Sequence, residues 1–293
     1  MAMLHNRHDT TSPRPQPADR VGKMSLAHLD TVSETLVIPL WARSVESRRG
    51  DGLLQDPQAE RIVAELDYDF ARFRDAAVSQ LTVCLRARAI DRWVGNFLRR
   101  HPTGTVCELG VGLDTRFDRL ENNLATYLEV DLPEVIALRR CFFSESRRRQ
   151  FIADSVVDSG WIERTKQTGG AHFFVAEGLL MYLRETEVKA LFSRLADQFP
   201  DSRIAFDTFS PLIADNLAWH DTMRFMRVGF NWSITQVRDI QGWDSRCRVI
   251  ESVGLEELGE HLHRLTLNQC MMLWALQFTP TYGVHLLQFA GNK

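Results

Sequence analysis

Residues 106–117 read VCELGVGLDTRF, so two glycines follow directly on a short apolar run. A glycine at the end of a strand lets the backbone approach a ligand closely, because no Cβ intervenes. In an open parallel sheet, ligands bind outside the carboxyl ends of the strands. Gly110 and Gly112 therefore indicate one part of a ligand site. A glycine pair after a strand is also typical of a plain tight turn, so other residues must decide between the two interpretations.

The spacing of this stretch differs from the fingerprint of dinucleotide-binding proteins. That fingerprint needs a third glycine for close packing of the helix on the strand. Thr115 stands at the corresponding position. A nicotinamide- or flavin-dependent oxidoreductase is therefore disfavoured and stays only as an alternative function.

Short apolar runs after the glycines alternate with helical patterns, which indicates a doubly wound α/β fold with a mostly parallel sheet. The predicted strands are Thr105–Leu109, Thr126–Val130, Gln150–Ile152, Phe173–Ala176 and Ile204–Phe206, with Arg248–Glu251 as a further possible strand. The predicted helices between them include Leu132–Phe143 and Glu185–Gln198. At the end of the chain, Cys270–Thr279 and Val284–Ala290 flank a turn and predict an antiparallel hairpin at the sheet edge.

Acidic residues stand where three of the predicted strands end. Asp131 lies about twenty positions beyond the glycines, where a carboxylate accepts hydrogen bonds from both hydroxyls of a ribose; Glu129 is the alternative. Asp154 follows the next strand and suits an adenine amino group, and Glu177 ends the one after. A single acid there is usually a helix cap, but a glycine pair and three acids on successive strand ends indicate one site. They favour an adenosine without a pyrophosphate and with a positive group, and S-adenosylmethionine fits that description.

The composition argues against several classes of protein. The 293 residues carry a formal net charge of −3, which gives little reason to expect nucleic acid as a partner. No run approaches the about 18 apolar residues that cross a membrane, and the N-terminus is polar rather than signal-like. The five cysteines form no C-x-x-C pair, so neither a zinc site nor a disulfide framework is indicated. We therefore expect a cytoplasmic protein with no metal, no nucleic-acid partner and no membrane partner.

The chain before the glycines is predicted to be helical. From Asp30 apolar residues recur at helical spacing, with Pro39 expected to kink or divide the helix, and a longer helix is predicted over Ala77–Arg99. We accordingly divide the chain into a disordered tail (1–24) and a single domain (25–293). That domain consists of a helical cap (25–104), a cofactor-binding core (105–210), an insertion (211–244) and C-terminal strands (245–293).

Six motifs carry a resemblance to a known family: SETLVIPLWARSVESRR (33–49), LRARAID (85–91), CELGVGLDTRFDRL (107–120), EVDLPEV (129–135), VAEGLLMYL (175–183) and YGVHLLQF (282–289). From about Asp30 on, the chain resembles the leucine carboxyl methyltransferase family, especially its bacterial branch of tetracenomycin-type polyketide O-methyltransferases. The resemblance implies a class I S-adenosylmethionine-dependent enzyme that releases S-adenosylhomocysteine. It also implies a seven-stranded sheet, extra N-terminal helices and an insertion before the last strands.

The same resemblance implies a role for each residue of the cofactor site. Arg86 is expected to hold the methionine carboxylate of the cofactor, with Arg88 as the second candidate. The other expected contacts are Gly110 at the methionine portion, with Glu108 and Gly112 in the same motif, Asp131 at the ribose, Asp154 and Ser155 at the adenine, and Glu177 beside the amino group. Arg86→Ala and Asp131→Ala are each expected to weaken cofactor binding and to leave the fold intact.

The insertion is expected to face the methyl acceptor. It holds Trp219, Met223, Phe225, Met226, Phe230 and Trp232. Such residues usually pack in a core, and the resemblance favours a lid over the substrate instead. Arg43, Tyr182, His220 and Trp232 are the candidates on the substrate side, and His220 beside Asp221 is the best candidate for a base.

The chemistry of the acceptor is not decided by the sequence. A carboxylate, with a pKa near 4, is ionised at neutral pH and needs no base, whereas a phenol near pKa 10 would profit from one. The family name and the lack of an obvious base dyad favour a carboxylate on an apolar, aromatic or polyketide-like small molecule of secondary metabolism. A phenol is the alternative, and a non-catalytic regulator that binds the cofactor is a further one. The oligomeric state is open.

Overall fold

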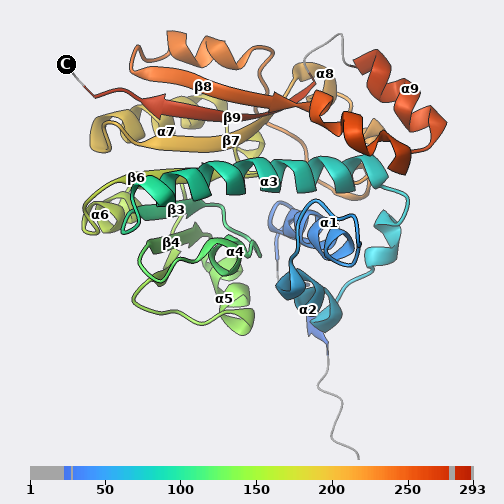
Figure 1. The fold of residues 1–293 in the computed structure, drawn as a ribbon, viewed down its shortest axis with the longest axis horizontal. Helices are drawn as coiled ribbons and strands as arrows, with labels where there is room; N and C mark the ends of the chain where they lie inside the picture. The colour runs from blue at the N-terminus through green and yellow to red at the C-terminus, as the bar shows by residue number, and fades with distance from the viewer. Residues whose placement is uncertain (1–22, 28, 277–280, 292–293) are drawn as a thin grey trace, which may run out of the picture.

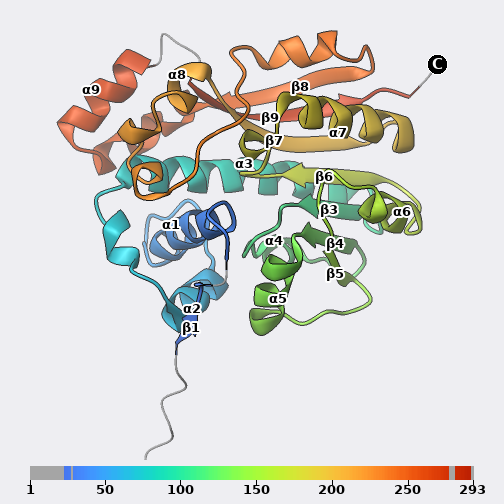
Figure 2. The same ribbon diagram turned by 180° about the vertical axis from the view of Figure 1, so that it is seen from behind.

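The computed structural model of the protein describes residues 23–27, 29–276 and 281–291. Figures 1 and 2 show one sheet with helices on both faces and a group of helices beyond one end of its strands. That group consists of α1 (Val37–Ser47), α2 (Pro57–Glu65), α8 (Pro211–Ala214) and α9 (Leu267–Leu276). The site lies where this group meets the strand ends.

The sheet of the described chain has seven strands in the order β5-β4-β3-β6-β7-β9-β8, which confirms the predicted doubly wound fold. The strands are β3 (Thr105–Leu109), β4 (Thr126–Asp131), β5 (Arg149–Ala153), β6 (His172–Ala176), β7 (Arg203–Phe209), β8 (Cys247–Gly254) and β9 (Tyr282–Phe289). Neighbours from β5 to β7 are parallel, and β9 runs antiparallel to both β7 and β8. The strand order reverses between β3 and β6, which is where such sheets bind ligands.

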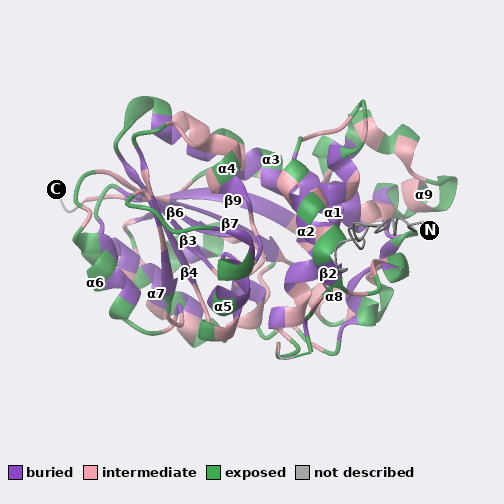
Figure 3. Cartoon of the chain, turned by 90° about the horizontal axis from the view of Figure 1, so that it is seen from below, coloured by how far each residue is buried: buried purple, intermediate pink, exposed green. Residues whose placement is uncertain are grey.

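Alternate residues of each strand pack against opposite layers of helices. Val106 and Phe173 face α3 (Ala77–Arg100), whereas Cys107 and Phe174 pack in the layer that holds α6 (Gly160–Lys166) and α7 (Glu185–Gln198). Two further helices follow β3 and β4, namely α4 (Arg116–Leu120) and α5 (Pro133–Phe142). Figure 3 shows the strands as the most buried layer of the molecule. Burial on both faces explains why these strands read as continuous apolar runs.

The antiparallel C-terminal pair is confirmed, but one of its predicted strands is wrong. The segment from Cys270 lies in α9 as far as Leu276, and residues 277–280, with part of the predicted turn, lie outside the described residues. The partner of β9 is instead β8, with Cys247 opposite Phe289. The reason is composition: LNQCMMLWAL holds leucine, methionine, glutamine and alanine, which favour helices, and no β-branched residue.

The N-terminal cap begins with a short parallel pair, β1 (Met24–Ser25) and β2 (Leu66–Asp67). The predicted tail therefore lies outside the described residues except at its last positions. A 3-10 turn over Ser33–Leu36 leads into α1, and Pro39 lies in the first turn of α1, where no backbone N–H is needed. The helix is thus divided before Pro39 and not broken at it.

The remaining helical turns are short. They are 3-10 segments at Phe70–Phe73, Leu180–Tyr182, Leu217–Trp219, Met223–Phe225, Val237–Gly242 and Leu255–Arg264. Three of them, with α8, make up the predicted insertion. Among the helices that the structure describes, none is long and apolar enough to cross a membrane.

Candidate active site

A cavity of about 790 Å³ opens at the carboxyl ends of β3, β4 and β6. The structure brings nearly all the predicted site residues to its walls: Arg43, Arg86, Glu108, Gly110, Gly112, Asp131, Asp154, Ser155, Glu177, Tyr182 and His220. Trp232 is the exception. It is buried beside Trp243, in the layer below the sheet that holds α7, so the structure gives no support for its expected contact with substrate.

The glycine turn after β3 is built on backbone angles that favour glycine. Gly110 has φ +66° and Gly112 has φ +52°. A Cβ at Gly110 would lie 2.8 Å from Cδ1 of Leu179. The Gly110 amide donates to the carbonyl of Val130 at 2.9 Å, and the Gly112 amide donates to Asp131 Oδ2 at 2.7 Å. The turn is therefore fixed to the end of β4, and its bare face forms part of the cavity wall.

We expect Gly110→Ala to lower the free energy of unfolding by about 1–3 kcal/mol, because it adds a left-handed strain and a contact with Leu179. Gly169→Ala is the matched control, since Gly169 has φ +63° and open space around its Cβ position. Urea unfolding of both variants separates the strain from the contact. Equal losses in the two variants would show that the contact with Leu179 costs nothing.

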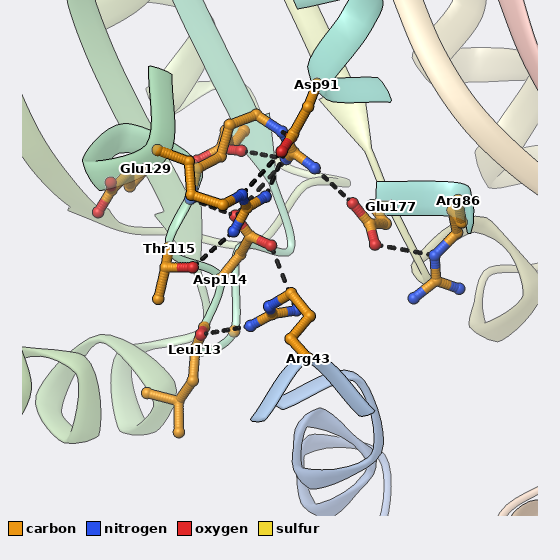
Figure 4. Close-up of polar contacts among 12 residues, drawn as sticks. Arg43, Arg86, Asp91, Leu113, Asp114, Thr115, Glu129 and Glu177 are labelled. Atoms are coloured by element: carbon orange, nitrogen blue, oxygen red, sulfur yellow. Dashed lines mark hydrogen bonds and ion pairs between the residues drawn. The ribbon is translucent and has the colours of Figure 1, made fainter. Parts of the chain in front are cut away.

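Thr115, at the place of the missing third glycine, ties the turn to the cap. Its hydroxyl donates to Asp56 Oδ2 at 2.6 Å. Arg43 of α1 donates to the same oxygen at 2.8 Å and to the carbonyl of Leu113 at 3.0 Å, and it forms an ion pair with Asp114 at 3.4 Å. Figure 4 shows Arg43 reaching across from α1 to Leu113 and Asp114. Arg43 was expected on the substrate side; it lines the cavity, and its contacts also fasten the helical cap to the glycine turn.

Asp131 sits at the end of β4, as predicted for a ribose contact. Its Oδ2 accepts from the Gly112 amide, and its Oδ1 accepts from the Leu132 amide at 2.8 Å. Burial raises the pKa of Asp131 to about 6, although these two hydrogen bonds act in the other direction. The alternative, Glu129, is excluded, because it is fully buried between Arg139 and Arg149.

Asp154 and Ser155 follow β5 on the same rim. Asp154 Oδ2 accepts from the Trp161 amide at 2.8 Å, near the start of α6, which is the capping role that a lone acid would have. No described residue donates a hydrogen bond to its other carboxylate oxygen, and the residue lines the cavity, so an adenine amino group remains a suitable partner.

Arg86 is part of a buried charged cluster. It donates to Glu177 Oε1 at 2.8 Å and to Asp207 Oδ2 at 2.9 Å. Burial opposes its charge, but Asp207 and Glu177 raise the pKa of Arg86 well above its usual range. Tyr282 donates to Asp207 at 3.3 Å. Arg88, the second candidate, is exposed.

Arg116 joins this cluster to the glycine turn. It donates to Glu177 Oε2 at 2.6 Å and to Asp91 at 2.7 Å, and it is paired with Glu108. Burial raises the pKa of Glu108 to about 7, against the effect of Arg116. Figure 4 shows Glu177 between this group and Arg86. Glu108 therefore reaches the cavity as the partner of a buried arginine.

Four residues of this site were not predicted from the sequence: Arg116, Asp207, Tyr282 and Asp91. Three of them lie in motifs that were read for other reasons. Asp207 had a usable signal, since it is an acid in the strand that follows the one ending at Glu177. Nothing in the sequence indicated that Asp207 is buried in the middle of β7, opposite Val284.

Tyr182 and His220, the two remaining candidates on the substrate side, line the same cavity. Burial raises the pKa of Tyr182 to about 12. His220 comes from the insertion and lies near the ring of Phe209, with 6.1 Å between the ring centroids. Both residues line the cavity, and their expected place beside the acceptor stays a prediction.

The charges on the cavity walls fit a cationic nucleoside. The lining holds seven carboxyl groups (Asp30, Glu108, Asp114, Asp131, Asp154, Glu177, Asp221) and three guanidinium groups (Arg43, Arg86, Arg116). An excess of carboxylates suits a sulfonium and an ammonium, and Arg86 can face the one carboxylate. Among the described residues, no cluster of histidine, cysteine or acidic side chains could hold a metal ion. The residues therefore fit S-adenosylmethionine.

This sheet, with β9 inserted antiparallel and with a glycine turn and acids on successive strand ends, defines the class of S-adenosylmethionine-dependent methyltransferases. A solved structure from Streptomyces avermitilis, of the duf574 family, shares the fold with a TM-score of 0.55 and 10% identity, over 88% of this chain and 99% of that one. At that identity the likeness bears on the fold alone.

The sequence comparisons give the family. Residues 37–196 match the model of the leucine carboxyl methyltransferase family. The chain is 33% identical over 214 residues to the tetracenomycin polyketide synthesis O-methyltransferase TcmP of Streptomyces glaucescens. The aligned segment covers 73% of this chain and 79% of that protein. It is also 27% identical over 241 residues to the S-adenosyl-L-methionine-dependent methyltransferase dpfgK of Gibberella zeae. That alignment covers 75% of this chain and 80% of the other. The chain belongs to the leucine carboxyl methyltransferase family and is an S-adenosylmethionine-dependent O-methyltransferase.

Proposed function

We propose that the protein transfers a methyl group from S-adenosylmethionine to a carboxylate oxygen of an apolar, aromatic or polyketide-like small molecule, as a step of secondary metabolism. The observation that carries the proposal is the acceptor end of the cavity, which is apolar on three sides. The similarity to TcmP, whose name places it in polyketide synthesis, supports the same class of acceptor.

Three segments that are distant in the sequence form this end of the cavity. The insertion supplies Leu212, Ile213, Trp219 and Phe230, α9 supplies Met272, Leu273, Ala275 and Leu276, and the first turns of α3 supply Val78. Trp219 is 75% exposed at the mouth. A wall of this kind suits an aromatic ring system, and it offers no row of basic groups for a protein tail or nucleic acid. We propose that residues 211–230 of the insertion act as the lid.

The polar groups of the cavity support a carboxylate acceptor rather than a phenol. A carboxylate is ionised at neutral pH, so no proton has to be removed. The carboxyl groups of Glu108, Asp114 and Glu177 are ion-paired with arginines and are poor candidates for a general base. A phenol acceptor is the alternative, and it would need His220 as the base.

In the proposed reaction, some residues bind the cofactor, and others align the acceptor and exclude water. When bound, S-adenosylmethionine supplies the methyl group on a sulfonium, and the electron pair of the broken C–S bond stays on sulfur. Asp131, Asp154 and Arg86 bind and orient it. The apolar end of the cavity aligns the acceptor and keeps water away, and alignment and exclusion of water are the main sources of rate for such a displacement.

The test uses acids that offer both oxygens at once. We expect the full chain, incubated with methyl-tritiated S-adenosylmethionine and 3-hydroxy-2-naphthoate or related hydroxy-naphthoic and hydroxy-anthroic acids, to label the carboxyl group. A methyl ester releases tritiated methanol in mild alkali, whereas an aryl methyl ether keeps its label. Label that survives alkali would show that the methyl group is on the phenolic oxygen. The phenol would then take the place of the carboxylate as the proposed acceptor. Absence of label across the panel, with S-adenosylhomocysteine bound, would favour a non-catalytic regulator.

The setting of the enzyme is also an inference. All five cysteines are free thiols, and three of them are buried. We propose a cytoplasmic enzyme on that support, because free thiols persist in a reducing compartment.

A further inference from the structure

The insertion is attached to the start of α3 through Asp221. The backbone amide of Ser79 donates to Asp221 Oδ2 at 3.2 Å, and the Ser79 hydroxyl donates to Oδ1. Ser79 is the third residue of α3, where backbone amides lack partners within the helix and a carboxylate is favoured. This attachment places the preceding residue, His220, in the wall of the cavity.

The contacts of His220 fix the position of its ring proton. The backbone amide of Met223 lies 3.4 Å from Nδ1, and a backbone N–H can only donate, so Nδ1 carries a lone pair. Thr222 Oγ1 lies 3.2 Å from Nδ1, and its hydroxyl can donate there as well. Ser79 Oγ lies 3.4 Å from Nδ1, but its hydroxyl donates its hydrogen bond to Asp221 and so does not donate to the ring. A neutral ring with an accepting Nδ1 carries its proton on Nε2.

The surroundings of His220 favour the neutral form of its ring. Burial lowers the pKa of His220, and the carboxylate of Asp221 opposes that shift less strongly. Asp221 is the charged group that interacts with the ring, at 3.7 Å from Nδ1, whereas Ser79 of α3 and Phe209 of β7 carry no charge. No described residue makes a hydrogen bond to Nε2, which leaves this N–H to a group in the cavity.

The position of the ring is that of the acceptor and not of the cofactor. Ser79 and Arg86 lie seven residues apart on the face of α3 that lines the cavity, about 10 Å along the helix at 1.5 Å per residue. Arg86 marks the methionine end of the site. His220, held on Ser79, therefore lies about two helical turns beyond it, beside the apolar wall.

We propose that His220 binds the acceptor by donating a hydrogen bond from Nε2–H to the carboxylate oxygen that is not methylated, and that it does not act as a base. The inference rests on the proposed function, because it assumes a carboxylate acceptor. Ser79, Asp221, Thr222 and the Met223 amide are positioning groups, since they act through the ring. The ester product has no proton to lose, so the reaction is complete without a proton transfer. A phenol would need His220 as its base, and an Nε2 that already carries a proton cannot take the phenolic proton, so this tautomer disfavours a phenol.

The first test needs no acceptor. The full chain with 15N-labelled histidine is examined by two-bond 1H–15N NMR at pH 7 with S-adenosylhomocysteine, and the His220 signals are assigned from their loss in His220→Gln. We expect the pattern of a neutral ring with the proton on Nε2. A neutral ring with the proton on Nδ1, or a charged imidazolium, overturns the inference and leaves the proposed function standing.

The second test uses the acid that the labelling panel identifies. His220→Gln keeps an N–H donor near Nε2 and has no basic nitrogen, so we expect kcat/KM within about threefold of the parent, whereas His220→Phe loses about 10- to 100-fold. The controls are His263→Gln and His263→Phe, at an exposed histidine, and S-adenosylhomocysteine affinity in every variant. An equal loss in His220→Gln and His220→Phe would make His220 a base. An alkali-stable product would refute the proposed function instead, whatever the NMR pattern.

Discussion

Replacement of Arg86 by alanine is expected to destabilise the protein by about 3–5 kcal/mol, in addition to weakening its hold on S-adenosylhomocysteine. The sequence alone predicted a loss of cofactor affinity with the fold intact. The structure corrects the second half of that prediction. Arg86 is the cation between Glu177 and Asp207, and Asp207 is fully buried. Without Arg86, a carboxylate in the middle of β7 loses its counter-charge.

The measurement is urea unfolding at pH 7 with Arg88→Ala as the control. Arg88 lies on the same helix and is exposed, so its replacement is expected to change the free energy of unfolding by less than about 0.5 kcal/mol. Alanine favours helices at both positions, which removes helix propensity as a cause. Asp207→Asn in the Arg86→Ala background is expected to recover part of the loss. If Arg86→Ala unfolded at the same urea concentration as the parent, Arg86 would not stabilise the buried carboxylate of Asp207.

Asp131→Asn is expected to do the reverse: it weakens binding of S-adenosylhomocysteine by about 10- to 100-fold and does not lower stability by more than about 1 kcal/mol. The affinity falls because a ribose loses a charged acceptor. The stability holds because the folded protein prefers the neutral form of this side chain, with a pKa near 6 against an ordinary value of 3.8. The stability that this group contributes is present at low pH and is lost as the pH rises through about 6. At pH 7 that contribution is already gone, and asparagine resembles the neutral form.

Two measurements check this prediction. Calorimetry of S-adenosylhomocysteine binding should show the affinity of the parent falling as the pH drops below about 6, where Asp131 takes up a proton. The affinity of Asp131→Asn should be flat over the same range. Urea unfolding gives the stability. A variant that binds like the parent would mean that Asp131 is not the ribose contact.

The parts of the fold that the sequence predicted well are those in which one local rule suffices. The strands from β3 to β7 were predicted to within a few residues, because burial on both faces makes them mostly apolar. The glycines and the acids Asp131, Asp154 and Glu177 were found because the carboxyl ends of parallel strands meet at one edge. Their positions at the ends of successive predicted strands were therefore enough to predict that they lie close together in the structure.

The sequence predicts less well where a tertiary partner decides the outcome. The helix α9 was predicted as a strand, because an apolar run without charged residues has no helical periodicity. Trp232 was assigned to the lid by its neighbours in the sequence, but it packs against Trp243 below the sheet. The resemblance placed Arg43 on the substrate side, but the sequence did not predict its ion pair with Asp56, at the start of another helix. No pattern within one segment gives such partners.

The position of β9 between β7 and β8 has a consequence for the synthesis of the protein. Of the seven strands of this sheet, β9 is the last to leave the ribosome, yet it is the strand that joins β8 to β7. Until that moment a nascent chain exposes two open strand edges, which readily pair with other chains. Production of the intact enzyme should therefore gain from a holding chaperone that covers these two edges until β9 has emerged.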